Sequence, residues 1–528
     1  GIDPYSRCNT AHDGRGLFIR DTPAMEESPG FDPSESVIYE MHLRDFTIDP
    51  QSGVHHKGKY LGSAEVGTRH ARFKEIKTGL DHLLELGINT VQILPVQDFE
   101  NDESSDTYNW GYMPVHFNSP DGWYATDTRG PQRVTELKRL VNALHKNGIK
   151  VVMDVVYNHT AESGGKEYGL SAMADGYYYR RKPDGAYWDG SACGNEFKSE
   201  SPMAGKFMLD SLKYWVREYK IDGFRFDLMA LIDRETMAEI VRELKSMKED
   251  ILIYGEPWAP GATPVAKIEK GSQRSAGFTI FNDNFRDAVK GNVFDLSPGY
   301  VQAGLNRDGV IAGIRGSIDD FTDSPLETVN YVSCHDNHTL WDRINLSVED
   351  DVPPEMRVDM DKLANAIILT SQGIPFLHSG EEFLRSKNGA ENSYNLPDSV
   401  NKIDWELKNA HNDVFKYYRG LIELRKKHPA FRMKTAEAVR KNLRFYEETG
   451  LPSTEPGIAY VIDGAAAGDL WREIVVLINP SWEKKEFRLP KGFFKVAADG
   501  RQTYAGWGKP VSGKIGVAPV SLMVLYKQ

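Results

Sequence analysis

Eight short apolar runs, separated by amphipathic segments, most constrain the fold of this chain. Several are continuously apolar, as expected for strands buried on both faces of a parallel sheet. The runs are Val37–Leu43, Thr90–Leu94, Lys150–Val155, Gly223–Asp227, Ile251–Gly255, Phe278–Asn282, Val329–Ser333 and Ile374–His378. Eight strands with interleaved helices predict an α/β fold, a (β/α)₈ TIM barrel with insertions. A doubly wound open sheet is the alternative, but no Gly-x-Gly-x-x-Gly motif follows the first run.

The segments between these runs have helical periodicity. Phe73–Leu86 carries apolar residues at helical spacing and is followed by Gly87, a residue suited to end a helix. The same pattern predicts helices at Val134–Lys146, Lys206–Tyr219 and Met237–Met247.

Three regions follow from the changes of pattern along the chain. Residues 1–36 are irregular and rich in Gly and Pro, and residues 37–429 carry the barrel pattern. Residues 157–205 form a connection after the third strand that is long enough to predict an inserted subdomain. From residue 430 to 528, short alternating runs separated by turn residues predict an all-β sandwich domain.

Composition excludes several classes of function. The 528 residues carry a net charge of −12, which argues against nucleic-acid binding and is compatible with a neutral substrate such as a sugar. No apolar stretch reaches the length of a transmembrane helix, so we expect no membrane partner. The three cysteines, Cys8, Cys193 and Cys334, are far apart and predict neither a disulfide framework nor a zinc site.

Two carboxylates stand at the ends of predicted strands. Asp227 closes the fourth run, and Glu256 follows the fifth. In a parallel barrel such residues face one another across the mouth, the layout a glycosidase needs for a nucleophile and an acid. Arg225 lies two residues before Asp227, on the same side of the strand, and would keep Asp227 ionised. For either carboxylate alone, a turn or helix cap is the commoner explanation, so the rest of the chain must decide.

Four segments in order carry a more specific pattern. They are Asp154–His159, Gly223–Met229, Gly255–Trp258 and Val332–His338, at the ends of the third, fourth, fifth and seventh strands. Together they resemble the four signature regions of the alpha-amylase clan of glycoside hydrolases.

A fifth motif resembles a narrower group. Tyr108–Tyr112 followed by Pro114 is similar to the Tyr-Asn-Trp-Gly-Tyr-Asp-Pro signature of type I pullulanases, with Met113 in place of the Asp. Those enzymes usually carry a β-sandwich carbohydrate-binding module before the barrel. Only the last piece of such a module is expected here, around Asp3–Tyr5, so the chain is either trimmed or lacks the module.

The resemblance implies a role for each matching residue. Asp227 would be the nucleophile of a retaining double displacement, Glu256 the acid and base, and Asp336 the third carboxylate that favours the distorted ring. Asp154 and Asn158 would support the site from below. The residues implied to bind substrate are Trp110, Tyr112, His159, Arg225, Trp258, Phe281, His335 and Asp398.

The implied activity is hydrolysis of α-1,6 branch linkages in pullulan, branched dextrins, starch or glycogen. Met113 leaves open an α-1,4-specific or mixed-specificity hydrolase, and a transglycosylase or branching enzyme would share the same machinery. A non-catalytic starch-binding protein should lack at least one catalytic carboxylate, whereas all three are present. We expect a monomer with an α-glucan as partner, no required cofactor, and calcium only as an optional structural ion. The sequence does not choose between the cytoplasm and export.

Overall fold

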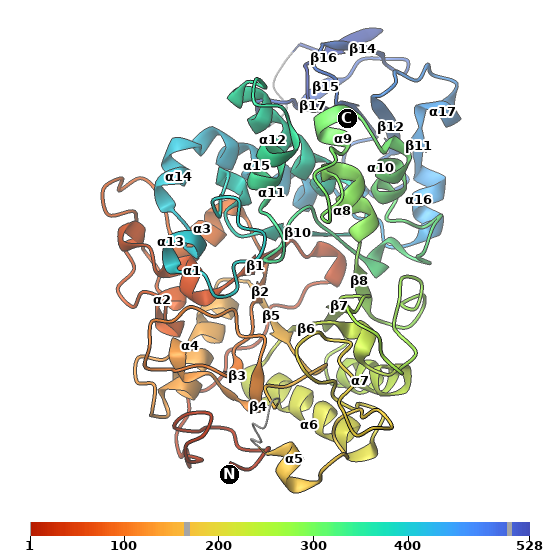
Figure 1. Ribbon diagram of the computed structural model, residues 1–528. Coiled ribbons are helices and arrows are strands. Elements are labelled where there is room, and N and C mark those ends of the chain that lie inside the picture. The colour runs from red at the N-terminus through yellow and green to blue at the C-terminus, as the bar shows by residue number, and fades with distance from the viewer. Residues whose placement is uncertain (1, 163–168, 504–508) are drawn as a thin grey trace.

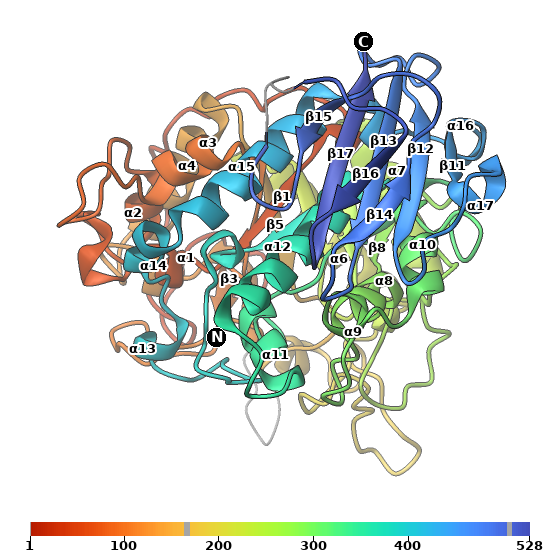
Figure 2. The same ribbon diagram turned by 90° about the horizontal axis from the view of Figure 1, so that it is seen from above.

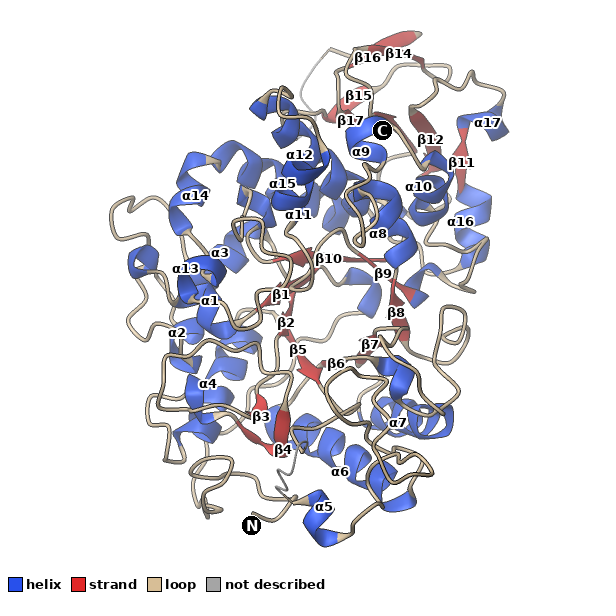
Figure 3. Cartoon of the chain, viewed as in Figure 1, coloured by secondary structure: helices blue, strands red, loops and turns tan. Residues whose placement is uncertain are grey.

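In the computed structural model, which describes residues 2–162, 169–503 and 509–528, eight parallel strands close into a barrel surrounded by helices (Figure 1). Figure 3 shows the strands as a central ring inside the helical layer. All eight predicted strands are confirmed. They are β1 (Ile38–Met41), β2 (Thr90–Ile93), β5 (Lys150–Val155), β6 (Gly223–Phe226), β7 (Leu252–Gly255), β8 (Thr279–Phe281), β9 (Thr328–Asn330) and β10 (Ile374–His378), with β10 pairing β1 to close the barrel.

Side chains alternate between the barrel interior and the helical layer, as the period of a strand requires. On β5, Val152 belongs to the small cluster inside the barrel, whereas Val151 and Met153 belong to the large cluster beneath the helices. Asp154 therefore points inward, and it lies in register with Arg225 on β6. The same alternation directs polar groups to the barrel interior from several strands.

The helical layer is built from long amphipathic helices. They are α3 (Gly79–Leu86), α4 (Gln132–Lys146), α6 (Pro202–Tyr219), α7 (Arg234–Met247), α8 (Asp283–Lys290), α10 (Arg307–Ile314), α11 (Leu340–Ser347), α12 (Pro354–Thr370) and α15 (Asn412–Lys427). The shorter helices are α1 (Leu43–Thr47), α2 (Tyr60–Ala64), α5 (Leu170–Met173), α9 (Tyr300–Ala303), α13 (Asp398–Asn401), α14 (Trp405–Ala410), α16 (Ala436–Asn442) and α17 (Tyr446–Thr449).

The helix predicted from Phe73 was wrong over residues 73–78, because α3 begins only at Gly79. The His70 ring accepts the backbone N–H of Phe73, and the Phe73 carbonyl accepts from Ile76. These local bonds close a turn that competes with the helix.

One hairpin was not predicted. β3 (Gln97–Phe99) pairs antiparallel with β4 (Pro114–Pro120) between the second and third barrel strands. Its register is irregular and β4 has proline at both ends, which hides the strand pattern in the sequence. The inserted segment 157–205 contains α5 and two isolated bridges, Tyr179 with Phe197 and Arg181 with Tyr187. Its residues 163–168 lie outside the described part of the chain.

The segment before β1 is irregular, as predicted, but it is fastened to the hairpin. The Asn9 amide donates to Asp98 on β3 at 2.9 Å, and its oxygen accepts from Arg133 on α4 at 3.0 Å. The amide of Asn118 on β4 donates to the Pro4 carbonyl at 3.2 Å. The N-terminal segment is therefore packed onto the barrel at several points.

The C-terminal domain is a β sandwich against one side of the barrel (Figure 2). One sheet has the order β11 (Leu443–Phe445), β12 (Ile458–Asp463), β13 (Glu473–Asn479), β17 (Ser521–Lys527) and β15 (Lys495–Ala498), and the other pairs β14 (Lys485–Arg488) with β16 (Lys514–Val517). Residues 504–508 lie outside the described part of the chain. Val475 and Phe487 pack between the two sheets. The opposite face of the larger sheet, with Ile474 and Val476, joins the barrel core.

The barrel and the C-terminal domain also share polar contacts. The Tyr460 hydroxyl on β12 donates to the Thr370 carbonyl at the end of α12, at 3.1 Å. Across residues 2–162, 169–503 and 509–528, no helix combines the length and the apolar character needed to cross a bilayer.

Candidate active site

A single guanidinium group joins three carboxyl groups at the carboxyl end of the barrel. Arg225 Nη1 donates to Asp154 Oδ1 and to Asp227 Oδ1, each at 3.0 Å. Its Nη2 lies 2.6 Å from Glu256 Oε1. The Arg225 side chain is 2% exposed, so these contacts are made away from bulk water. The structure thus brings the two predicted catalytic carboxylates to one buried cation.

The charges of this group do not balance if every carboxyl group is ionised. Burial is the main cause that raises the pKa of Glu256, to about 8, with the negative charges of Asp227 and Asp336 adding to it against the opposing effect of Arg225. Burial likewise raises the pKa of Asp154 to about 7, although Arg225 and His335 oppose the change. A neutral Glu256 at pH 7 can give up a proton, as a general acid must.

The backbone after Asp227 helps to orient both carboxyl groups. Leu228 adopts a left-handed conformation, with φ of 39°, which is uncommon for a residue with a side chain. In this conformation its N–H donates to Glu256 Oε2 at 2.8 Å. The Asn158 amide donates to Asp227 Oδ2 at 2.8 Å and to the Asp227 carbonyl at 2.9 Å. The unusual backbone conformation of Leu228 therefore occurs where the carboxyl groups of Asp227 and Glu256 are held in place by hydrogen bonds.

His335 and Asp336 form the opposite side of the site. The ring Nδ1 of His335 lies 2.7 Å from Glu40 Oε1, and its Nε2 lies 3.5 Å from Asp336 Oδ2. Burial lowers the pKa of His335, but the negative charges of Asp336 and Glu40 outweigh burial and raise the pKa to about 9. The ring is therefore a cation at neutral pH. The Asp336 side chain is 48% exposed, in contrast to the buried Asp154.

Aromatic rings flank this histidine. The Tyr112 ring stacks on His335 with centroids 5.0 Å apart and an interplanar angle of 17°, and the Tyr112 hydroxyl donates to Asp154 at 2.7 Å. Trp110 meets the same imidazole edge-on at 4.9 Å. The predicted substrate contacts Trp110, Tyr112 and His335 are thus neighbours.

Both ring nitrogens of His159 already have partners within the protein. Its Nδ1 lies 2.6 Å from Asn158 Oδ1, and its Nε2 lies 2.7 Å from the Tyr112 carbonyl. Burial lowers the pKa of His159, and a neutral ring can donate to only one of these oxygens. A hydrogen bond to substrate would have to replace one of these two contacts.

A cavity of about 590 Å³ opens beside the carboxyl groups. Its lining includes Glu256, Asp336, Trp258, Phe281 and Phe294. Trp258 and Phe281 lie at a tilted angle with centroids 6.4 Å apart, and Phe281 also packs into the barrel interior. Both predicted aromatic residues therefore face the space next to the acid.

The structure does not place Asp398 in this group. Asp398 is the first residue of α13, and both of its oxygens accept hydrogen bonds from Arg44 at 2.8 Å. Arg44 also pairs with Asp106. A substrate contact by Asp398 stays a prediction, and it would compete with this bidentate ion pair.

Glu40 is a site residue that the sequence analysis missed. It is the last inward-facing residue of β1 and is 1% exposed. Its carboxyl group accepts the backbone N–H of His335 and also contacts the ring Nδ1 of His335. The rule that drew attention to Asp227 and Glu256, a carboxylate at the carboxyl end of a barrel strand, applies equally to Glu40. It was overlooked because Glu40 lies inside the first apolar run.

Two groups of potential metal ligands occur among the described residues, and one is buried. In the buried group, Asp98, Glu103 and Asp121, both Glu103 oxygens accept from Arg133 and both Asp121 oxygens accept backbone N–H bonds. Asp98 Oδ1 alone has no hydrogen-bond partner. A calcium ion bound by these three residues would have to replace Arg133 as the partner of Glu103, so the group as it stands does not fit such an ion.

Comparison with known proteins places this arrangement in a family. Residues 67–406 match the model of the alpha amylase catalytic domain, and residues 439–502 match the pullulanase all-beta domain. The first match covers the barrel strands from β2 to β10 and the site residues from Trp110 to Asp398, whereas β1 with Glu40 lies before it. The second match covers most of the described C-terminal strands.

Individual relatives agree with the family models. The chain is 38% identical to the pullulanase of Bacillus subtilis over 507 residues, covering 93% of this chain and 69% of that protein. The pullulanase of Bacillus acidopullulyticus is 44% identical, with a TM-score of 0.95 over 100% of this chain and 65% of that one. The pullulanase of Paenibacillus barengoltzii with maltohexaose and alpha-cyclodextrin is 42% identical, with a TM-score of 0.93 over 100% of this chain and 83% of that one. The chain thus spans about two thirds of the length of the two Bacillus relatives. The chain belongs to the pullulanases, glycoside hydrolases of the alpha-amylase family.

Proposed function

We propose that the chain hydrolyses α-1,6-glucosidic branch linkages with retention of configuration at the anomeric carbon. The observation that carries the proposal is the sharing of Arg225 between Asp227 and Glu256. Two carboxyl groups bonded to the two ends of one guanidinium fork lie close together. Retaining glycosidases hold their carboxyl groups roughly 5–5.5 Å apart, whereas inverting enzymes leave room for a water at roughly 6.5–9.5 Å.

The two carboxyl groups would divide the chemistry by their ionisation. In the first step an Asp227 oxygen attacks the anomeric carbon while the bond to the glycosidic oxygen breaks, and Glu256 gives its proton to that oxygen. In the second step a water attacks the anomeric carbon, Glu256 takes a proton from the water, and Asp227 leaves as the carboxylate. The raised pKa of Glu256 supports its role as the acid of the first step.

The surrounding groups would stabilise the charged transition state. Asp336 is exposed to the cavity and carries a carboxylate that can hold sugar hydroxyls and a developing oxocarbenium ion. The Tyr112 ring, backed by His335, offers a face for the sugar bound at the cleaved linkage. All of these groups come from one chain. The proposed site thus needs no residue from a second subunit, and we propose a monomer with no required cofactor.

The choice of an α-1,6 linkage rests on the relatives. The matched proteins are pullulanases, and solved relatives hold malto-oligosaccharides. The Tyr108–Tyr112 motif lies directly beside the site, where Trp110 and Tyr112 both contact His335. We propose an α-glucan as the partner of this site on the same grounds.

Product analysis on two substrates tests this proposal. The enzyme should release maltotriose from pullulan and leave linear maltoheptaose intact, with the Asp227→Ala variant as the blank. Release of panose from pullulan, or cleavage of maltoheptaose, would instead establish α-1,4 hydrolysis.

Azide rescue tests the roles of the two carboxyl groups separately. Azide should restore cleavage by Asp227→Ala and give a β-glycosyl azide, since azide then replaces the nucleophile in a single displacement. With Glu256→Ala, azide should give the α-glycosyl azide, because it attacks the glycosyl-enzyme. Asp233→Ala, at the N-cap of α7, is a matched control that should retain activity. The same azide stereochemistry from both variants would refute the division of roles.

A further inference from the structure

We propose that a polar groove between the barrel and the C-terminal domain is an accessory α-glucan site, adjoining the active-site cavity across the loop 291–299. This inference rests on the proposed function, because it extends the path of the same polysaccharide. It assigns to the groove the binding of glucan units remote from the cleaved linkage.

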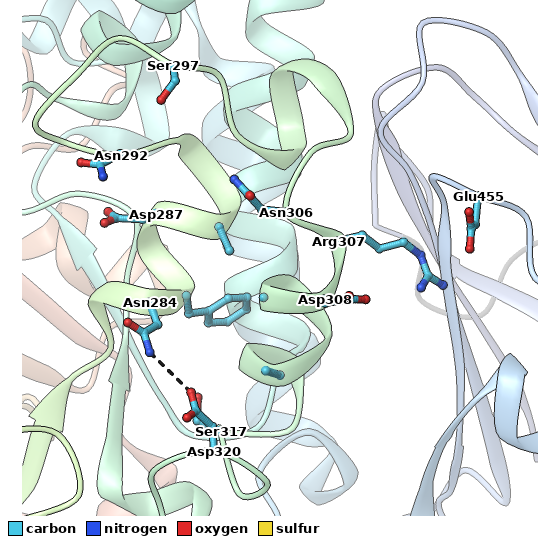
Figure 4. Close-up of a pocket in the computed structure, with 14 residues that line it drawn as sticks. Asn284, Asp287, Asn292, Ser297, Asn306, Arg307, Asp308, Ser317, Asp320 and Glu455 are labelled. Atoms are coloured by element: carbon cyan, nitrogen blue, oxygen red, sulfur yellow. Dashed lines mark hydrogen bonds between the residues drawn. The ribbon is translucent and has the colours of Figure 1, made fainter.

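The groove is a cavity of about 860 Å³, larger than the space beside the carboxyl groups. Figure 4 shows side chains from α8 and α10 on one side and Glu455 of the C-terminal domain across the opening. Its labelled polar residues are Asn284, Asp287, Asn292, Ser297, Asn306, Arg307, Asp308, Ser317, Asp320 and Glu455.

The chemistry of this lining suits a neutral, polyhydroxylated ligand. Amide groups both donate and accept, and carboxylates accept two bonds, so together they match the hydroxyls along a glucan. Asn284 and Asp308 are exposed, and they stand on the two helices that form the floor. Arg307 is the cation of the lining, and it already pairs with Glu447. An anionic ligand would therefore meet mainly carboxylates, which disfavour it.

Exposed apolar side chains lie next to groove residues in the sequence or contact the helix that precedes them, which is the second observation. Phe294 is 87% exposed and Leu296 is 52% exposed on the loop 291–299, and Leu305 is 50% exposed beside Asn306. Trp482 is 49% exposed, and its indole N–H donates at 3.3 Å to the Gln302 carbonyl of α9, the helix that precedes the groove residue Asn306. Sugars present an apolar face of C–H groups as well as hydroxyls, so rings beside polar groups bind them well.

The exposure of Phe294 is built into the fold. Arg343 on α11 is 1% exposed, and its Nη2 donates to the carbonyls of Asn292, Asp295 and Ser297. Gly291 fits this arrangement, since a Cβ there would lie 2.1 Å from the Ser297 carbonyl oxygen. A buried anchor thus holds the loop in place while its aromatic tip stays in solvent.

The same loop forms a wall of both cavities. Val293 and Phe294 line the space beside Glu256, whereas Asn292 and Ser297 line the groove. Helix α8 is shared in the same way, with Arg286 facing the first space and Asp287 the second. A branched glucan bound at the carboxyl groups can therefore continue over Phe294 into the groove.

Binding to glycogen tests the proposal without turnover. In the Asp227→Ala background, the triple change Asn284→Ala, Asp308→Ala and Trp482→Ala should raise the apparent Kd for glycogen about tenfold, as read from migration in glycogen-containing native gels. In the active enzyme the same triple change should lower kcat/KM for glycogen by a similar factor. It should leave kcat/KM for a short branched dextrin within about twofold.

A matched control replaces an exposed ring and a first-turn aspartate elsewhere. Phe493→Ala with Asp413→Ala should leave both measurements unchanged. Unchanged migration of the triple variant in glycogen gels would overturn the proposal. An equal loss on the short dextrin, or an equal loss in the control, would overturn it as well. Absence of cleavage by the parent enzyme would instead refute the proposed function, because the gel reads binding by itself.

Discussion

Glu40 holds His335 by two contacts that fix both the position and the charge of the ring. Its Oε2 accepts the backbone N–H of His335 at 2.7 Å, and its Oε1 lies 2.7 Å from the ring Nδ1. The partner of the remaining Nε2 is Asp336, at 3.5 Å. Glu40 therefore directs the second ring nitrogen toward the most exposed of the three predicted catalytic carboxyl groups.

Replacing Glu40 should move the alkaline limit of activity. His335 has a pKa of about 9 and Glu256 a pKa of about 8, so loss of the Glu256 proton sets the limit in the parent enzyme. Glu40→Gln removes a charge that raises the pKa of His335, and we expect the limit of kcat/KM to shift to lower pH with about a tenfold loss at pH 7. NMR titration of the ring would follow the His335 pKa directly. Glu65→Gln, which breaks another Glu–His pair, should change neither quantity; an unshifted His335 pKa in Glu40→Gln would contradict the prediction.

The raised pKa of Glu256 should also make the free energy of unfolding depend on pH. Its folded pKa of about 8 lies above its unfolded value of roughly 4.3, so the folded state keeps a proton that the unfolded state loses. The contribution of this group is therefore present at low pH and is lost as pH rises toward 8. Glu256→Gln should lower kcat at least about a thousandfold. Relative to the parent it should gain thermal stability at pH 8 but not at pH 4, as read by calorimetry.

Tyr112 combines a ring and a hydroxyl with separable effects. Tyr112→Phe removes the bond to Asp154 but keeps the ring on His335, so we expect about a tenfold loss of kcat with little change in KM. Tyr112→Ala removes the platform and should raise KM about tenfold or more. Tyr157→Phe is the control, since the Tyr157 hydroxyl donates to Ser211 on α6, in the helical layer. Equal kinetics for the two Tyr112 variants would show that the ring has no role in binding.

Arg343 should matter for folding although it touches no predicted catalytic group. Arg343→Ala leaves the carbonyls of Asn292, Asp295 and Ser297 without this donor in a partly buried loop. We expect a loss of about 2–4 kcal/mol in the free energy of unfolding and proteolysis within 291–299. Arg242→Ala, on the exposed face of α7, should cost less than about 0.5 kcal/mol. A parent-like protease pattern in Arg343→Ala would count against the anchoring role.

Met113 departs from the pullulanase signature, yet its change should have a small effect. Its carbonyl accepts the Glu100 N–H at 2.8 Å, and the side chain is not among those lining the cavity at Glu256. Met113→Asp should alter the ratio of pullulan to maltoheptaose cleavage by less than about threefold. A larger shift in that ratio would make residue 113 a determinant of linkage preference.

The sequence predicted the barrel well because its strands are buried on both faces and therefore read as continuous apolar runs. It failed at the β3–β4 hairpin, where Pro114 and Pro120 hide the strand. It also failed at residues 73–78, where the turn closed by His70 replaces the predicted start of the helix. These errors share a cause, since local hydrogen bonds and irregular register leave no periodic signal.

The candidate site divides in the same way. Asp227, Glu256 and Arg225 could be placed together from strand position alone, because parallel strands end at one face. The contact of Glu40 with His335 joins the first and seventh strands of the barrel, and the donation from Leu228 to Glu256 depends on a left-handed backbone. Neither long-range pairing nor a single unusual φ is encoded in a local pattern.

The bonds that fasten the N-terminal segment have a mechanical consequence. Asn9 donates a hydrogen bond to Asp98 on β3, and the Pro4 carbonyl accepts one from Asn118 on β4. Strand β4 begins two residues after Tyr112. No flexible linker separates these anchors from Tyr112, the proposed contact of the sugar ring. A force applied to the chain ahead of Pro4 would reach Tyr112 through one short hairpin, so tension at that end would be transmitted to the proposed site of cleavage.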